Sequence, residues 1–172
     1  MLKKVKEVRR NEDEDSITRM NRDVFTLNNT TSSSSSVVNN ILNQLHGSFS
    51  QLTVLNLRNI RLTSCDVIAP CAGTLTVLDL SNNALTVLPS FWTTFKKLKV
   101  LLLCKNNLYS WKEIIKLKEC CLLEYLTFYD NPCTKSRCLR SFLVNEMKHL
   151  KCLDHYVVTD EERIQGAGKN IV

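Results

Sequence analysis

Eight cysteines and three histidines are among the side chains of this 172-residue sequence that could act as nucleophiles, acid–base groups or metal ligands. A zinc site would require paired Cys-x-x-Cys or Cys/His clusters. The closest spacings here are the adjacent pair Cys120 and Cys121, and Cys133 with Cys138. No nucleophile motif, glycine-rich phosphate loop or metal-spaced cluster stands near His46, His149 or His155. We therefore expect no catalytic site, no metal and no cofactor.

Asparagine supplies a different chemistry, because its amide can both donate and accept hydrogen bonds where a chain turns out of regular structure. Asn83 and Asn106 each close the pattern L-x-x-L-x-L-x-x-N, and Asn131 closes a third copy. An earlier copy has Ile60 at this place, so we expect its turn to be looser or satisfied by a neighbour. The three asparagines are predicted to form a structural ladder.

The leucines of the same pattern predict the elements that position these asparagines. The copies begin at Leu52, Leu75, Leu98 and Leu123, which are 23, 23 and 25 residues apart. Such spacing is typical of leucine-rich repeats. The second and third leucines of each copy alternate with other residues, as in a short strand with one face buried. The fold class predicted is an α/β solenoid, a right-handed leucine-rich repeat superhelix with a parallel sheet on its concave face and helical or irregular convex segments.

The segments between strands supply the rest of the predicted core. Residues 111–119 form an amphipathic pattern typical of a helix, while Pro70 and Pro89 favour short or irregular helical turns. The predicted core residues of these segments are Leu62, Ile68, Cys71, Leu85, Leu88, Phe91, Phe95, Ile114, Ile115 and Leu117.

Both ends of a solenoid must be covered. Residues 37–50 are predicted as an N-terminal helical cap, because Val38, Ile41, Leu42 and Leu45 share one helix face. Residues 52–132 form four repeats and residues 133–165 a C-terminal cap, in which Thr159 and Glu162 fit a capping box. Residues 1–36 are charged and serine-rich and are predicted to be a disordered tail, and residues 166–172 a flexible tail.

Composition limits the cellular setting and the partners. The 23 basic and 17 acidic residues give a net charge of +6, which permits an acidic partner but lacks the charge density of a nucleic-acid binder. No run of apolar residues is long enough for a membrane helix. The basic start at Met1 is followed by a charged stretch instead of an apolar signal region, so we expect a reducing compartment and free thiols. The alternative is a disulfide flank at Cys133 and Cys138.

Outward-pointing strand positions predict the binding surface. They line up as three rows across the four strands. The candidate partner-binding residues are Val54, Val77, Val100 and Tyr125 in the first row, Asn56, Asp79, Leu102 and Thr127 in the second, and Arg58, Ser81, Cys104 and Tyr129 in the third. Apolar and aromatic anchors with charges toward the rim are the composition of a protein interface. The alternative is that Val and Tyr simply suit strands.

The C-terminal residues resemble a known family. Leu150, Leu153-Asp154 and Val158-Thr159 with Glu161-Glu162-Arg163 resemble the cap of intracellular leucine-rich repeat proteins. This family includes the regulatory subunit 7 of protein phosphatase-1 and the spliceosomal A-prime protein. Its Tyr-Arg and Leu-Pro pairs are replaced here by Leu139-Arg140 and Met147-Lys148.

A further resemblance, over about residues 50–165, is to the N-terminal repeat domain of proteins that combine leucine-rich repeats with an IQ domain. It is carried by Phe91-Trp92, Leu98-Lys99, Leu143-Val144-Asn145, Leu150-Lys151, Leu153-Asp154-His155, Asp160-Glu161-Glu162 and Ile164-Gln165. Glycines follow Gln165 where an IQ helix would stand, so the resemblance implies no calmodulin-binding helix here. The wider architecture of these proteins leaves open whether the chain is full-length or is a short form or a piece of a longer protein.

Two functions follow as hypotheses. The first is a non-enzymatic scaffold or adaptor, expected to be monomeric, that binds another protein on the concave face; the family resemblance implies cytoplasmic, ciliary or cytoskeletal complexes. The alternative, implied by the spliceosomal relative, is a component of an RNA–protein complex that holds an RNA-binding protein, with a nuclear location. Lys96, Lys97, Lys99 and Lys105 are compatible with RNA contact and equally with a solvated face.

Overall fold

The computed structural model describes residues 17–21, 23–28, 51–135 and 138–167. The predicted helical cap at residues 37–50 lies outside the described residues, as does most of the predicted tail at 166–172. Side chains of the repeats and of the C-terminal cap are described almost throughout.

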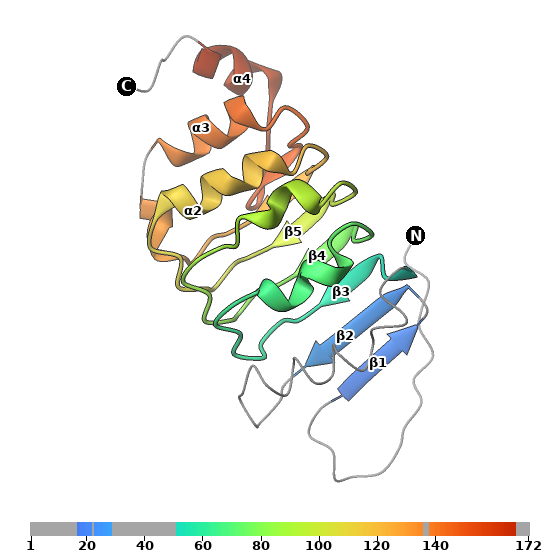
Figure 1. The fold of residues 1–172 in the computed structure, drawn as a ribbon. Coiled ribbons are helices and arrows are strands. Elements are labelled where there is room, and N and C mark those ends of the chain that lie inside the picture. The colour runs from blue at the N-terminus through green and yellow to red at the C-terminus, as the bar shows by residue number, and fades with distance from the viewer. Residues whose placement is uncertain (1–16, 22, 29–50, 136–137, 168–172) are drawn as a thin grey trace.

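A single curved sheet runs through the described part of the molecule, with its eight strands in chain order (Figure 1). The six inner strands are parallel, and the outermost pairs are antiparallel. The strands are β1 (Ile17–Asn21), β2 (Val24–Asn28), β3 (Val54–Asn56), β4 (Val77–Asp79), β5 (Val100–Leu102), β6 (Tyr125–Thr127), β7 (Cys152–Leu153) and β8 (Tyr156–Val157). This arrangement is the predicted solenoid.

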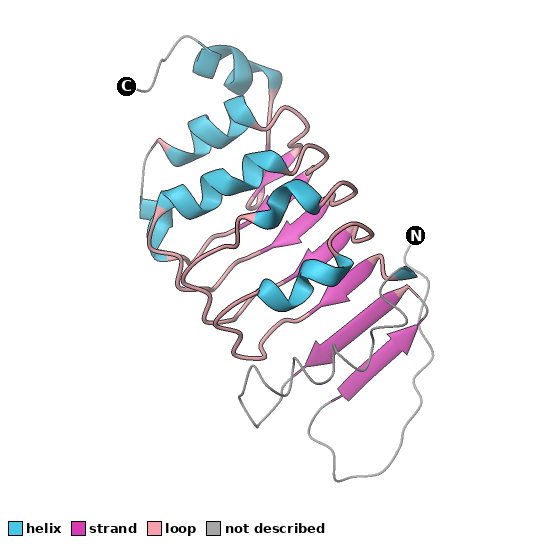
Figure 2. Ribbon diagram, in the orientation of Figure 1, coloured by secondary structure: helices cyan, strands magenta, loops and turns pink. Residues whose placement is uncertain are grey.

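Helical segments cover one face of this sheet and leave the other open (Figure 2). They are η2 (Asp66–Cys71), η3 (Phe91–Thr94), α2 (Trp111–Ile115), η4 (Lys116–Glu119), η5 (Pro132–Lys135), α3 (Leu139–Glu146) and α4 (Asp160–Ala167). The predicted helix at 111–119 is therefore one α-helical turn continued as a 3₁₀-helix. Pro70 lies inside η2, where a short 3₁₀-helix tolerates it.

The core lies between the sheet and these helices. Leucines at the same position of successive strands, Leu55, Leu78, Leu101 and Leu126, are paired in register and fully buried. The convex side adds Trp92 and Phe95, whose ring centroids are 4.8 Å apart. Of the predicted convex core, Phe91 and Ile115 are only partly buried and the other residues are buried. Each coil thus packs its apolar face onto the next.

Two strands lie in the part of the predicted disordered tail that the structure describes, residues 17–21 and 23–28. Strands β1 and β2 form a hairpin, and β2 pairs in parallel with β3, so that Phe25 lies beside Leu55. Phe25 and Leu27 are buried. The low-complexity composition of the segment hides the alternation Val24, Phe25, Thr26, Leu27, which suits a strand that extends the sheet and covers its end. This hairpin does part of the capping that sequence analysis assigned to a helix.

The C-terminal cap is held by charged side chains on α3 and α4. The Arg140 guanidinium donates to both carboxylate oxygens of Glu162, at 2.6 and 2.9 Å. The Thr159 hydroxyl accepts from the Glu162 backbone N–H at 3.2 Å. Only this half of the predicted capping box forms as expected, because the carboxylate of Glu162 pairs with Arg140.

No helix in the described part of the chain has the length and apolar character needed to cross a membrane.

Candidate functional site

The open face of the sheet carries the predicted rows of outward-pointing side chains. Val54, Val77, Val100 and Tyr125 are partners in register from β3 to β6, and the same holds for Asn56, Asp79, Leu102 and Thr127. All eight are partly or well exposed, and the strand leucines between them are buried. The first two predicted rows are therefore brought together as one continuous surface, which we call the concave face.

In the structure, these rows continue onto the neighbouring strands β2 and β7. Val24 and Thr26 of β2 pair with Val54 and Asn56, and Cys152 of β7 pairs with Tyr125. Sequence analysis missed these residues because β2 was hidden in a segment expected to be disordered, and because β7 is only two residues long. A degenerate copy of the leucine spacing, Leu150 followed by Leu153, was the available signal for β7.

A shallow hollow of about 340 Å³ lies on this face where the repeats meet the C-terminal cap. Its lining comes from β5, β6, β7 and the turn after β7. The lining residues are Val100, Leu102, Tyr125, Leu126, Thr127, Cys152 and Asp154. Four of these were predicted binding residues, while Cys152 and Asp154 were not. Tyr125 keeps 45% of its surface exposed beside the hollow, so an aromatic ring borders an otherwise largely aliphatic surface.

Hydrogen bonds fix the far edge of the hollow. The Asp154 carboxylate oxygen Oδ1 accepts from the backbone N–H groups of Phe128 and Tyr129, at 2.7 and 3.0 Å. Because these bonds hold the carboxylate in place, the edge is set before any partner arrives. The Thr127 hydroxyl is buried and has no hydrogen-bond partner among the described residues.

The third predicted row is less accessible than expected. Ser81 and Cys104 are buried, with 2% and 9% of their surface exposed. The Tyr129 ring leans against the His155 ring at a centroid distance of 4.6 Å. A hydrogen bond between the Tyr129 hydroxyl and the Cys104 thiol raises the pKa of Tyr129. Arg58 of the same row is exposed. Ser81 and Cys104 are therefore less accessible to a partner than the sequence predicts, and binding through this row stays a prediction.

The structural asparagines link each coil to the one before it. Asn106 Nδ2 donates to the Leu80 and Leu103 carbonyls at 3.0 and 2.9 Å, and its Oδ1 accepts from the Leu85 N–H at 3.1 Å. Asn83 and Asn131 make the equivalent bonds. The Ile60 N–H, which has no asparagine in its own coil, donates to Asn83 Oδ1. The ladder therefore supports the strands and lies beside the concave face.

Among the residues that the structure describes, the remaining reactive side chains do not converge on a site. All eight cysteines are free thiols, and desolvation raises the pKa of Cys65 and Cys120 to about 12 and that of Cys71 to about 11. Such thiols stay protonated at neutral pH and are poor nucleophiles. Within the described residues, no group of three or more His, Cys, Asp or Glu side chains could hold a metal ion.

Comparison with known proteins agrees with this geometry. No family model matches the chain. The chain is 39% identical over 116 residues to leucine-rich repeat and IQ domain-containing protein 3 of Mus musculus, a match that covers 66% of this chain and 18% of that protein. It is also 33% identical over 95 residues to the probable U2 small nuclear ribonucleoprotein A′ of Caenorhabditis elegans, covering 55% of this chain and 38% of that protein.

Among solved structures, the Drosophila melanogaster SNF/U2A′ complex contains a chain that superposes with a TM-score of 0.63. The match covers 88% of this chain and 85% of that chain at 17% sequence identity, which shows a shared fold. The chain is a leucine-rich repeat protein. As a leucine-rich repeat protein it resembles the IQ-domain relative in sequence, but the match spans less than a fifth of that relative's length.

Proposed function

We propose that this leucine-rich repeat chain is a protein-binding module, a scaffold or adaptor that docks a partner on its concave face at the hollow beside Tyr125. The observation that carries the proposal is an open face with partly exposed Val100, Leu102 and Tyr125 around one hollow. The central leucines of the strands, Leu55, Leu78, Leu101 and Leu126, are buried in the core, so this apolar surface is not needed for packing within the coil.

The make-up of the hollow supports a protein partner. Tyr125 and aliphatic side chains of β5 and β6 line the hollow, Asp154 lies at its edge, and Asp79 pairs in register with Leu102 on the neighbouring strand. Central apolar anchors surrounded by polar groups are typical of protein interfaces. The strand backbone holds these side chains in register, so a partner meets a surface that is already formed, which reduces the entropic cost of binding.

Substitution at the hollow tests this proposal. Tyr125→Ala and Leu102→Ala remove exposed anchors, and we expect proteins captured from a cell extract by the wild-type chain to bind at least about tenfold more weakly, the scale of a central aromatic anchor. Tyr109→Ala is the matched control, since Tyr109 is 71% exposed and lies outside the lining of the hollow. Mass spectrometry identifies the captured proteins, and thermal unfolding checks that each variant is folded. Unchanged capture by folded Tyr125→Ala and Leu102→Ala would place the binding surface elsewhere.

The likeness to U2 small nuclear ribonucleoprotein A′ supports a second candidate, a component of an RNA–protein complex that holds an RNA-binding protein. In that case the captured proteins would include RNA-binding proteins and the location would be nuclear, whereas the first candidate fits cytoplasmic, ciliary or cytoskeletal complexes. Direct RNA contact would weaken steeply with added salt because lysine–phosphate contacts release counterions. A salt titration with a uridine oligonucleotide separates direct RNA binding from binding through a protein.

A further inference from the structure

Lysines gather at one edge of the concave face, where the chain enters the strands. Leu98, Leu123 and Leu150 occupy equivalent buried positions in three successive coils. The residues just before them are therefore also equivalent and lie side by side. These are Lys96-Lys97, Cys121-Leu122 and Lys148-His149, and all six are exposed.

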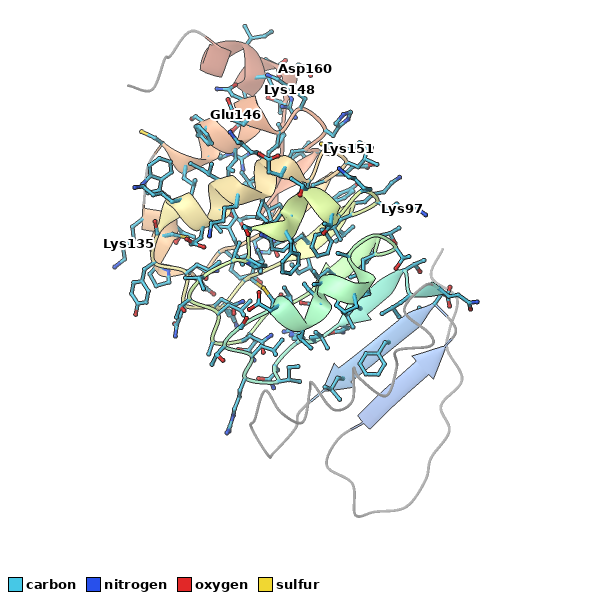
Figure 3. The ribbon with its side chains drawn as sticks, viewed as in Figure 1. Lys97, Lys135, Glu146, Lys148, Lys151 and Asp160 are labelled. Atoms are coloured by element: carbon cyan, nitrogen blue, oxygen red, sulfur yellow. The ribbon has the colours of Figure 1, made fainter. Side chains whose placement is uncertain are left out.

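The residues just after these leucines continue the same edge. The Lys99 carbonyl accepts from the Glu124 N–H, and the Glu124 carbonyl accepts from the Lys151 N–H, at 2.9 and 2.7 Å. Lys99, Glu124 and Lys151 thus stand in one row. We call the whole edge the entry rim, formed by Lys96, Lys97, Lys99, Leu122, Glu124, Lys148, His149 and Lys151. Figure 3 shows Lys97 and Lys151 projecting from the same side of the molecule, away from Lys135.

The charge of the entry rim is strongly positive. Its one carboxylate, Glu124, lies 2.6 Å from the Lys151 ammonium and 3.6 Å from that of Lys99. The hydrogen bond from Lys151 lowers the pKa of Glu124, so this carboxylate stays ionised and its charge is already matched. Lys96, Lys97 and Lys148 form no ion pair with a carboxylate of the described residues. The ammonium groups of these three lysines are therefore exposed to solvent and are not neutralised by the carboxylate of the rim.

Exposed apolar side chains, those of Leu122 and Tyr125, lie among these lysines. Leu122 is 42% exposed and occupies the position equivalent to Lys97 and His149 of the two neighbouring coils, one residue after the position shared by Lys96 and Lys148. Tyr125 follows three residues later and leads from the rim to the hollow. Because neighbouring strands are spaced about 4.8 Å apart, residues two coils apart are separated by roughly 10 Å. Lys96 and Lys148 therefore offer cations at that separation, with Leu122 next to the line between them.

We propose that the entry rim recognises an acidic segment of a partner protein, in which an apolar side chain stands between carboxylates. This inference rests on the proposed function, since the segment would continue from the rim into the hollow. A segment in the polyproline II conformation has three residues per turn and rises roughly 3.1 Å per residue, so carboxylates at i and i+3 point to the same side about 9 Å apart and reach both lysine positions. An apolar residue between them then lies next to Leu122. A nucleic-acid backbone would use the lysines alone and leave Leu122 and the aliphatic hollow in water.

Fluorescence anisotropy with labelled synthetic peptides tests this on the full 172-residue chain. The acidic probe is a peptide of four Glu-Glu-Leu repeats, and the uncharged probe has four Ser-Ser-Leu repeats. We expect the acidic probe to bind about tenfold more tightly than the uncharged one at low salt and to lose most of this advantage as the salt concentration rises. Equal binding of the two peptides would overturn the inference.

Charge reversal locates the contact. Lys97→Glu with Lys148→Glu should weaken binding of the acidic probe by about tenfold, because two attractive contacts become repulsive. The matched control is Lys112→Glu with Lys135→Glu, which changes the net charge equally; neither residue belongs to the entry rim, and both are exposed. We leave Lys99 and Lys151 unchanged because they pair with Glu124. An equal loss in both double variants would overturn recognition by the rim.

Two further outcomes separate this inference from the proposed function. If the acidic probe needs Lys97 and Lys148 but not Tyr125 or Leu102, the rim binds by itself and docking in the hollow is wrong. If Tyr125→Ala weakens both peptides alike while the lysine reversal has no effect, the hollow binds and the acidic partner is wrong. A uridine oligonucleotide that binds more tightly than the acidic peptide, through the same two lysines, would replace the protein segment with nucleic acid.

Discussion

One backbone conformation recurs at the same position of successive coils. Asn59, Asn82, Lys105 and Asp130 all have φ between 56° and 59°, just after a strand and before the ladder position. Asn and Asp tolerate this left-handed conformation because their short side chains bond locally, whereas other residues with a Cβ are strained there by about 1–2 kcal/mol. Lys105 is therefore the least suited residue of this row. The backbone of the coil therefore requires a positive φ at this position, whichever residue occupies it.

At this scale we predict that Lys105→Asn stabilises the protein. The substitution places at residue 105 the amino acid found at the equivalent position of two other coils, and should raise the free energy of unfolding by about 0.5–1 kcal/mol through relief of left-handed strain. Chemical denaturation measures the change. Lys97→Asn is the control, because Lys97 is exposed and is not among the residues with positive φ. A loss of stability in Lys105→Asn would contradict the strain assigned to this residue.

The C-terminal cap contains helices α3 and α4, and hydrogen bonds from two arginines connect them. Arg140 near the start of α3 donates to the Leu153 carbonyl at 3.1 Å in addition to its two bonds to Glu162 on α4. Arg163 on α4 donates to the Val144 and Leu150 carbonyls around the end of α3. Carbonyls at a helix C-terminus lack partners within the helix, and a cation there also interacts favourably with the helix dipole. The cap is thus held by directional bonds as well as by its apolar core.

For this element we predict that Arg140→Lys loosens α4. Lysine cannot reproduce the two parallel bonds to Glu162, so the free energy of unfolding should fall by about 1 kcal/mol, with hydrogen exchange accelerated first in α4 and β8. Arg58→Lys serves as the control because Arg58 is exposed on the concave face, away from the cap. Unchanged amide protection of α4 in Arg140→Lys would show that the bonds between Arg140 and Glu162 do not hold the cap.

At the scale of the whole molecule, each coil contacts mainly its neighbours. The strands pair only in chain order, and the leucine rows run through the stack without interruption. In such a solenoid, stability is close to a sum of coil and interface contributions, so the terminal coils depend on their caps. The β1–β2 hairpin supplies Phe25 and Leu27 to the first interface, and both are buried. It therefore protects the end of the core from water.

We predict that Phe25→Ala unravels the stack from its N-terminal end. Removing a buried phenylalanine should cost about 3–5 kcal/mol, and hydrogen exchange should accelerate in β3 before β5 and β6 because coupling passes through adjacent coils. Thr26→Ala is a matched control in the same strand, since Thr26 faces the concave side and is only partly buried. Simultaneous loss of protection in β3 and β6 would indicate one cooperative unit instead.

Much of the fold and part of the site follow directly from the spacing of residues. Leucines at a fixed spacing can be buried together in only one arrangement. The sequence therefore predicted the strands, the outward rows that contain Val77 and Asp79, and the structural role of Asn83 and Asn106 in the ladder. Failures occurred where a residue's role depends on distant neighbours. Glu162 was assigned to a capping box, but Arg140, which is far off in the sequence, takes its carboxylate.

The sequence by itself determined the repeat, its register and the side of each strand that faces outward, because a period of two and a coil of 23 to 25 residues are local properties. Only the tertiary structure decided which outward residues are accessible, how the N-terminal hairpin joins the sheet, and where the hollow lies. These depend on contacts between coils: Cys104 is buried through its neighbours, β2 is placed by β3, and the hollow exists only because β7 and Asp154 close one side of it.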